Sequence, residues 1–143
     1  MRNSRKDWII LFCFTFLVFL LTSCNSKKMY AYYEDTNNYI SVSGTISHIQ
    51  WSEELTGLYL GFTDMSVSLP DNCFKVVGDN FLILQTKKNA ELIKIGTPVT
   101  FITAPKIFGD GYVAPIVSIE LNNTMILEFD EGVENLLSWI DSK

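Results

Sequence analysis

Only a few residues of this 143-residue chain are of the types that catalyse reactions or bind transition metals. The chain has one histidine, His48, and three cysteines, Cys13, Cys24 and Cys73. A structural zinc site needs four such ligands, and neither a second histidine nor a cysteine pair accompanies His48. A nucleophile pair of Cys73 and His48 would have to be assembled by the fold, because no catalytic motif surrounds either residue. We therefore predict no catalytic site, metal site or cofactor.

A short glycine-rich segment, GDG at residues 109–111, is the other candidate for chemistry. It lacks the longer Gly-x-x-x-x-Gly-Lys spacing of a phosphate-binding loop. A calcium ion takes six to eight oxygen ligands, and Asp110 supplies only one carboxylate. The segment therefore predicts a tight turn.

This turn belongs to the sequence APKIFGDGY (104–112), which predicts a surface loop. Loops on a rigid scaffold often carry binding residues, and exposed aromatic side chains often anchor a partner. We expect partner contact here from Phe108, Asp110 and Tyr112, with Trp51 and Tyr59 joining if the fold brings them near. The alternative is that Phe108 and Tyr112 only cover one end of the domain.

The amino-terminal segment has the layout of an export signal. Arg2, Arg5 and Lys6 precede residues 8–22, which form a run of 15 uncharged residues, and Ser23 and Cys24 follow. The run is shorter than the roughly 20 residues that a membrane-spanning helix needs. A permanent transmembrane helix is therefore the weaker alternative.

The sequence Leu21-Thr22-Ser23-Cys24 resembles the lipobox of bacterial lipoproteins. The resemblance implies signal cleavage between Ser23 and Cys24 and a diacylglyceryl group, with fatty chains such as palmitate, on the Cys24 sulfur. Two acyl chains, at about 0.8 kcal/mol per buried methylene, hold a protein stably on a bilayer. We expect a signal peptide (1–23), a lipidated tether (24–38) and one folded domain (39–143) on the extracytoplasmic face of the cell membrane.

Removal of residues 1–23 would also change the number of unmodified cysteines and the net charge. Cys73 would be the only unmodified thiol, so no internal disulfide could form, and we expect a small core residue there. The net charge would change from −5 to −7, because residues 1–23 contain three basic groups and Asp7. The remaining chain has eight lysines and no arginine. This balance argues against a nucleic-acid partner.

The tether contains an aromatic patch of Met29, Tyr30, Tyr32 and Tyr33. As a flexible coil, a tether of this length would span roughly 20 Å. Alternatively, the patch docks on the domain or on lipid headgroups, and we favour docking on the domain.

Most of the remaining chain has the alternating pattern of β-strands. His48 alternates with Ile40, Val42 and Ile46, which predicts a histidine at the edge of the core, and Gly44 suggests a bulge. Asn122-Asn123 predicts a hairpin turn. A short helix is expected over 87–95, stopped by Gly96, and an amphipathic helix at the carboxyl end, with Asp130 as its N-cap. The predicted strands are 39–49, 58–62, 74–77, 81–84, 97–103, 113–121 and 124–129.

A short helix between the third and fourth strands of a small barrel resembles the OB-fold, and Gly96-Thr97-Pro98-Val99-Thr100-Phe101 looks like the entry to its fourth strand. The expected fold is mainly β: a closed or partly open OB-fold-like barrel with one short internal helix and a carboxyl-terminal amphipathic helix. Another small β-barrel or a β-sandwich is the alternative.

The sequence FGDGY followed by PIVSIE resembles small lipoproteins of Gram-positive bacteria, a likeness that implies no activity. We expect a membrane-tethered, non-catalytic binding or interaction module whose partner is a protein or a small molecule. The alternatives are an accessory structural subunit of a surface complex and, with less support, a small exported enzyme.

Overall fold

The computed structural model describes residues 26–52, 57–108 and 113–143. The predicted cleavage and lipidation residues, Ser23 and Cys24, lie outside these ranges, as do the loop residues Asp110 and Tyr112.

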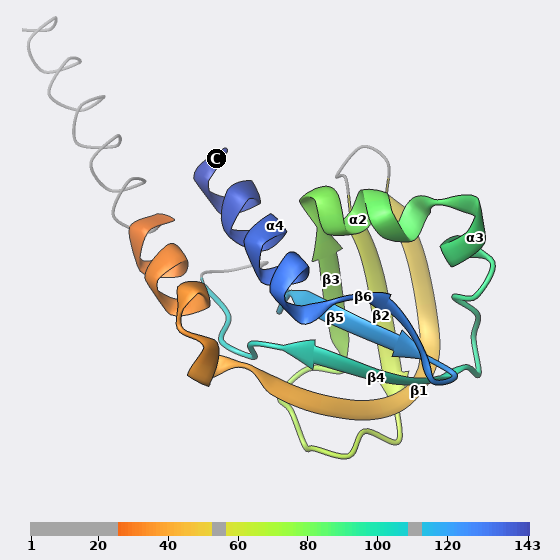
Figure 1. Ribbon diagram of the computed structural model, residues 1–143. Helices are drawn as coiled ribbons and strands as arrows, with labels where there is room; N and C mark the ends of the chain where they lie inside the picture. The colour runs from red at the N-terminus through yellow and green to blue at the C-terminus, as the bar shows by residue number, and fades with distance from the viewer. Residues whose placement is uncertain (1–25, 53–56, 109–112) are drawn as a thin grey trace, which may run out of the picture.

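The central element is a six-stranded antiparallel sheet, in which the long and strongly curved β1 lies near the middle (Figure 1). The strand order is β3-β2-β1-β4-β5-β6. The mainly β class predicted from alternation is therefore confirmed. The strands are β1 (Ile40–Ser52), β2 (Gly57–Thr63), β3 (Cys73–Val77), β4 (Pro98–Thr103), β5 (Ile116–Leu121) and β6 (Thr124–Leu127).

The sheet is not closed into a barrel, and β3 and β6 form its two edges. β3 is nevertheless close to the chain that leads into β5. Lys75 forms an isolated parallel bridge with Pro115, and the Lys75 amide donates a 2.9 Å hydrogen bond to the Ala114 carbonyl. Curvature of the sheet thus brings its first edge near the fifth strand, and a single bridge joins them among the residues that the structure describes.

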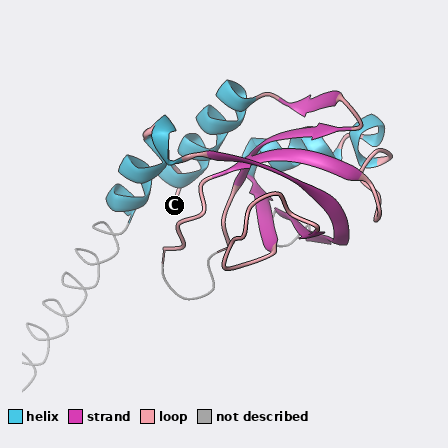
Figure 2. Ribbon diagram, turned by 90° about the horizontal axis from the view of Figure 1, so that it is seen from below, coloured by secondary structure: helices cyan, strands magenta, loops and turns pink. Residues whose placement is uncertain are grey.

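Helices gather at two places around the sheet (Figure 2). Residues 26–34 form a helix, named here the N-terminal helix, which is followed by the 3-10 turn η1 (Thr36–Asn38). It lies beside α4 (Phe129–Asp141) at one end of the sheet. α2 (Gly78–Gln85) and the short α3 (Lys87–Ala90) connect β3 to β4.

Two apolar clusters stabilise this arrangement. The larger one lies between one face of the sheet and α2, and it includes Phe62, Phe74 and Phe101, whose rings lie 4.3–5.7 Å apart between centroids. The smaller one lies between the N-terminal helix, α4 and the sheet, and it contains the buried side chains of Met29 and Tyr33. The aromatic patch of the tether therefore docks on the domain, as we favoured.

One predicted strand is wrong. Residues 81–84 lie in α2, because Gly78 adopts a positive φ of 59° and turns the chain out of β3. Phe81 and Leu84 are buried and Leu82 between them is exposed, which is the spacing of a helix face. The uniformly apolar FLIL sequence fits either structure, since such a run has no diagnostic period.

The predicted position of His48 is also wrong. The pairing of β1 with β2 shifts by one residue between Ile46 and His48, so that Ser47 forms a bulge. Because of this extra residue, Ile46 and Ile49 both face the core and His48 is exposed. Gly44, where we expected a bulge, is instead in regular register with Val99.

The predicted hairpin turn is confirmed, since Asn122 and Asn123 have φ values of 49° and 64° between β5 and β6. The carboxyl-terminal helix is confirmed as well, but its N-cap is Glu128, and Asp130 lies in the first turn. The short helix predicted at 87–95 is confirmed only over its first half, as α3.

Candidate functional site

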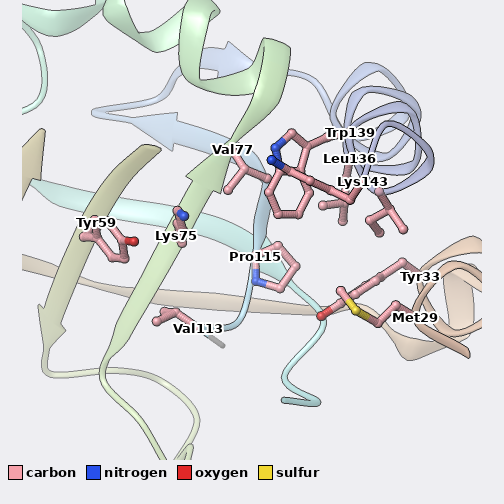
Figure 3. A pocket seen from close by; sticks show the side chains of 11 residues that line it. Met29, Tyr33, Tyr59, Lys75, Val77, Val113, Pro115, Leu136, Trp139 and Lys143 are labelled. Atoms are coloured by element: carbon pink, nitrogen blue, oxygen red, sulfur yellow. The ribbon is translucent and has the colours of Figure 1, made fainter. Parts of the chain in front are cut away.

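A cavity of about 400 Å³ opens between the N-terminal helix, α4 and the β2–β3 side of the sheet (Figure 3). This volume is within the range of about 300–1,000 Å³ that is usual for small-molecule sites. Most of its walls are apolar or aromatic, and two lysines complete them. The lining residues are Met29, Tyr33, Tyr59, Lys75, Val77, Val113, Pro115, Leu136, Trp139, Ile140 and Lys143.

The sheet supplies one wall through the register of β2 and β3. Tyr59 pairs directly with Lys75, so both side chains project from the same face. The Lys75 ammonium lies 5.0 Å from the centroid of the Tyr59 ring, a cation–π contact. Gly57 makes room for the lysine, since a Cβ at Gly57 would lie 2.5 Å from the Lys75 Cε.

α4 supplies a second wall with Leu136, Trp139 and Ile140, which helical spacing places on one side. The helix lies very close to β5, because a Cβ on Gly132 would overlap the carbonyl oxygen of Val117. A buried amide also holds it, since Asn80 donates a 2.8 Å hydrogen bond to the Gly132 carbonyl. These contacts fix the position of α4, and therefore the width of the cavity.

The N-terminal helix supplies a third wall with Met29 and Tyr33, four residues apart. Two tyrosine hydroxyls hold this helix in place. Tyr33 donates to the Lys106 carbonyl at 3.2 Å, and Tyr39 donates to the Tyr33 carbonyl at 2.8 Å. Burial raises the pKa of Tyr39 well above its usual value, and the nearby Tyr32 adds to the shift.

The three expected partner-contact residues that the structure describes lie in three different places. Phe108 packs against Tyr32 and Tyr33, with ring centroids 5.4 and 5.7 Å away, so it covers the N-terminal helix. Tyr59 lines the cavity. Trp51 is 37% exposed and packs on Phe81 of α2. Trp51 and Tyr59 project from opposite faces of the sheet, because Tyr59 pairs with Gln50, the neighbour of Trp51.

His48 and Cys73 lie in one row across three strands, with Gly61 between them. No hydrogen bond joins their side chains in the part of the chain that the structure describes. Burial raises the pKa of the Cys73 thiol, the charge of Asp71 adds to this shift, and a backbone hydrogen bond at Phe74 opposes it. This direction is opposite to the lowered pKa that is typical of nucleophilic cysteines.

The described ranges contain no cluster of three or more His, Cys, Asp or Glu side chains that could bind a metal ion. Among residues 26–52, 57–108 and 113–143, no helix combines the length and the apolar character needed to cross a membrane. Comparison with protein families, with curated proteins and with solved structures finds no match to this chain.

Sequence reasoning missed most of the cavity, including both of its lysines. A partial signal was present for Lys75, because the alternation of CFKVV places it on the opposite side of β3 from Phe74 and Val76. For Lys143, two residues beyond the end of α4, there was no such signal. Only the packing of α4 against the sheet brings it to the same cavity as Lys75.

Proposed function

We propose that this protein is a non-catalytic binding protein, anchored to the extracytoplasmic face of a bacterial membrane by a lipid on Cys24. The observation that carries the binding role is the cavity between the N-terminal helix, α4 and the sheet. It has the size and the mixed apolar and polar lining of a small-molecule site. Cleavage before Cys24 would leave only Asn25 between the lipidated residue and the first described residue of the N-terminal helix.

The proposal includes a relationship to the OB-fold. Three features support it. β1 pairs with both β2 and β4, helices connect β3 to β4, and β5 pairs with the edge of β4 that faces away from β1. The parallel bridge between Lys75 and Pro115 is a fourth, because it lies where a closed barrel would join β3 to β5.

The anchor is tested by expressing the full chain in a bacterium and measuring the mass of the processed protein. We expect a chain that begins at Cys24 and carries a diacylglyceryl group. Labelled palmitate should enter the wild-type protein and the matched Cys73→Ser variant, but not Cys24→Ser. A product that retains residues 1–23, with an unmodified Cys24, would contradict the anchor.

A further inference from the structure

The charges around the cavity are opposite to those of the chain as a whole. From Cys24 onward the chain has eight lysines and fifteen acidic residues. Among the described residues that line the cavity there are two lysines, Lys75 and Lys143, and no acidic side chain. Two lysine side chains therefore line this site in a protein that is otherwise strongly acidic.

The two ammonium groups are held by aromatic rings and not by carboxylates. Lys143 Nζ lies 5.1 Å from the centroid of the Trp139 ring, and Lys75 Nζ lies over the Tyr59 ring. Neither lysine forms an ion pair with a carboxylate of the described residues. A ring face orients an ammonium without neutralising its charge, so the N–H donors that point away from the ring are available for an anion.

Part of the remaining lining is apolar and well buried. Val77, Leu136 and Ile140 are 2–4% exposed, and Pro115 completes this part of the wall. Figure 3 shows the two lysine side chains beside the cavity, Lys75 on β3 and Lys143 just beyond the last residue of α4. The cavity thus offers an apolar surface and a cationic rim within about 400 Å³.

We propose that this cavity binds a small amphipathic anion, with its apolar part against Val77, Pro115 and Leu136 and its carboxylate or phosphate group at Lys75 and Lys143. This inference rests on the proposed binding role and names the ligand class. It does not depend on the lipid at Cys24.

The test uses the full processed chain in nanodiscs of neutral phosphatidylcholine, with equilibrium dialysis against empty nanodiscs as the blank. The probes are octanoate, octyl phosphate and the uncharged octanamide. The variant Lys75→Gln/Lys143→Gln removes both cations from the cavity. The matched control Lys87→Gln/Lys88→Gln removes the same charge from exposed positions on α3.

We expect at least one anionic probe to bind the wild-type protein about tenfold more tightly than octanamide, because contacts to an ionised group are the stronger ones. This preference should disappear in Lys75→Gln/Lys143→Gln and persist in the control. Retained octanamide binding by that variant would show that its cavity is still folded. The stronger of the two anionic probes identifies the head group.

The inference is overturned if octanamide binds the wild-type protein as well as both anions do, or if none of the three probes binds. It is also overturned if the α3 control loses as much affinity as the cavity variant, since that would indicate attraction by net charge alone. An unlipidated Cys24 would refute the proposed anchor and leave this binding result unaffected.

Discussion

The close approach of α4 to β5 predicts that Gly132→Ala destabilises the protein, although alanine is the better helix former. A Cβ at this position would overlap the Val117 carbonyl oxygen and lie 2.7 Å from its carbon. Since both groups belong to backbone, α4 would have to move away from the sheet. That movement would also stretch the 2.8 Å hydrogen bond from Asn80 to the Gly132 carbonyl.

The magnitude follows from three opposing effects. Overpacking a tight contact costs about 1–3 kcal/mol, and a weakened buried hydrogen bond costs about 1 kcal/mol. Replacing glycine by alanine within a helix returns about 1 kcal/mol. We therefore expect the free energy of unfolding to fall by about 2 kcal/mol.

Urea unfolding of the full processed chain in detergent, followed by far-UV circular dichroism, measures this change. Ser138→Ala is the matched control, because Ser138 is exposed on the same helix and its alanine gains helix propensity without a new contact. If Gly132→Ala proves as stable as Ser138→Ala, α4 does not lie against β5 as described. The shape of the cavity would then be wrong as well, because three of its lining residues lie on α4.

Three further predictions concern buried or strained groups. Asn80→Ala should lower the free energy of unfolding by about 2 kcal/mol in the same assay, because it removes the buried side-chain hydrogen bond from Asn80 to the Gly132 carbonyl. Adding Asn135→Ala to the Asn80→Ala variant should lower the free energy of unfolding only slightly further, because Asn135 donates its hydrogen bond to Asn80. A second loss as large as the first would refute this coupling. Asn123→Ala should cost about 1 kcal/mol because of its φ of 64°, whereas Asn123→Gly should not, and equal losses would argue against the turn. Iodoacetamide should alkylate the Cys73 thiol more slowly in the folded protein than in urea at mildly alkaline pH, because burial raises the pKa of this thiol. Equal alkylation rates would contradict the raised pKa. The contribution of the protonated Cys73 thiol to the free energy of unfolding is complete below the pKa of the unfolded thiol and decreases as the pH rises toward the pKa of the folded one.

The strands that could be predicted are those whose local pattern and burial agree. In β4, Val99 and Phe101 alternate with half-exposed residues, and the Asn122-Asn123 pair has few conformations other than a turn. The amphipathic spacing of α4 was equally informative. In these segments local preference and tertiary packing favour the same structure.

The failures arose where tertiary contacts decide between local alternatives. The sequence FLIL at 81–84 fits a strand or a helix. The hydrogen bonds that Asn80 forms with Gly132 and Asn135 favour the helix. A bulge at Ser47 leaves no mark in the alternation of β1, so the side on which His48 lies could not be inferred. The cavity was missed for a related reason, because it exists only where α4 packs on the sheet.

The pairing of the N-terminal helix with α4 has a practical consequence for labelling this protein. Ser26 and Lys27 share a surface depression with Ile140 and Asp141, so the two terminal helices meet side by side. A fluorescent reporter fused after Lys143 would lie beside the N-terminal helix and the cavity that Lys143 lines. The segment joining β2 to β3, at the bottom of Figure 1, lies apart from both terminal helices and offers an alternative insertion point.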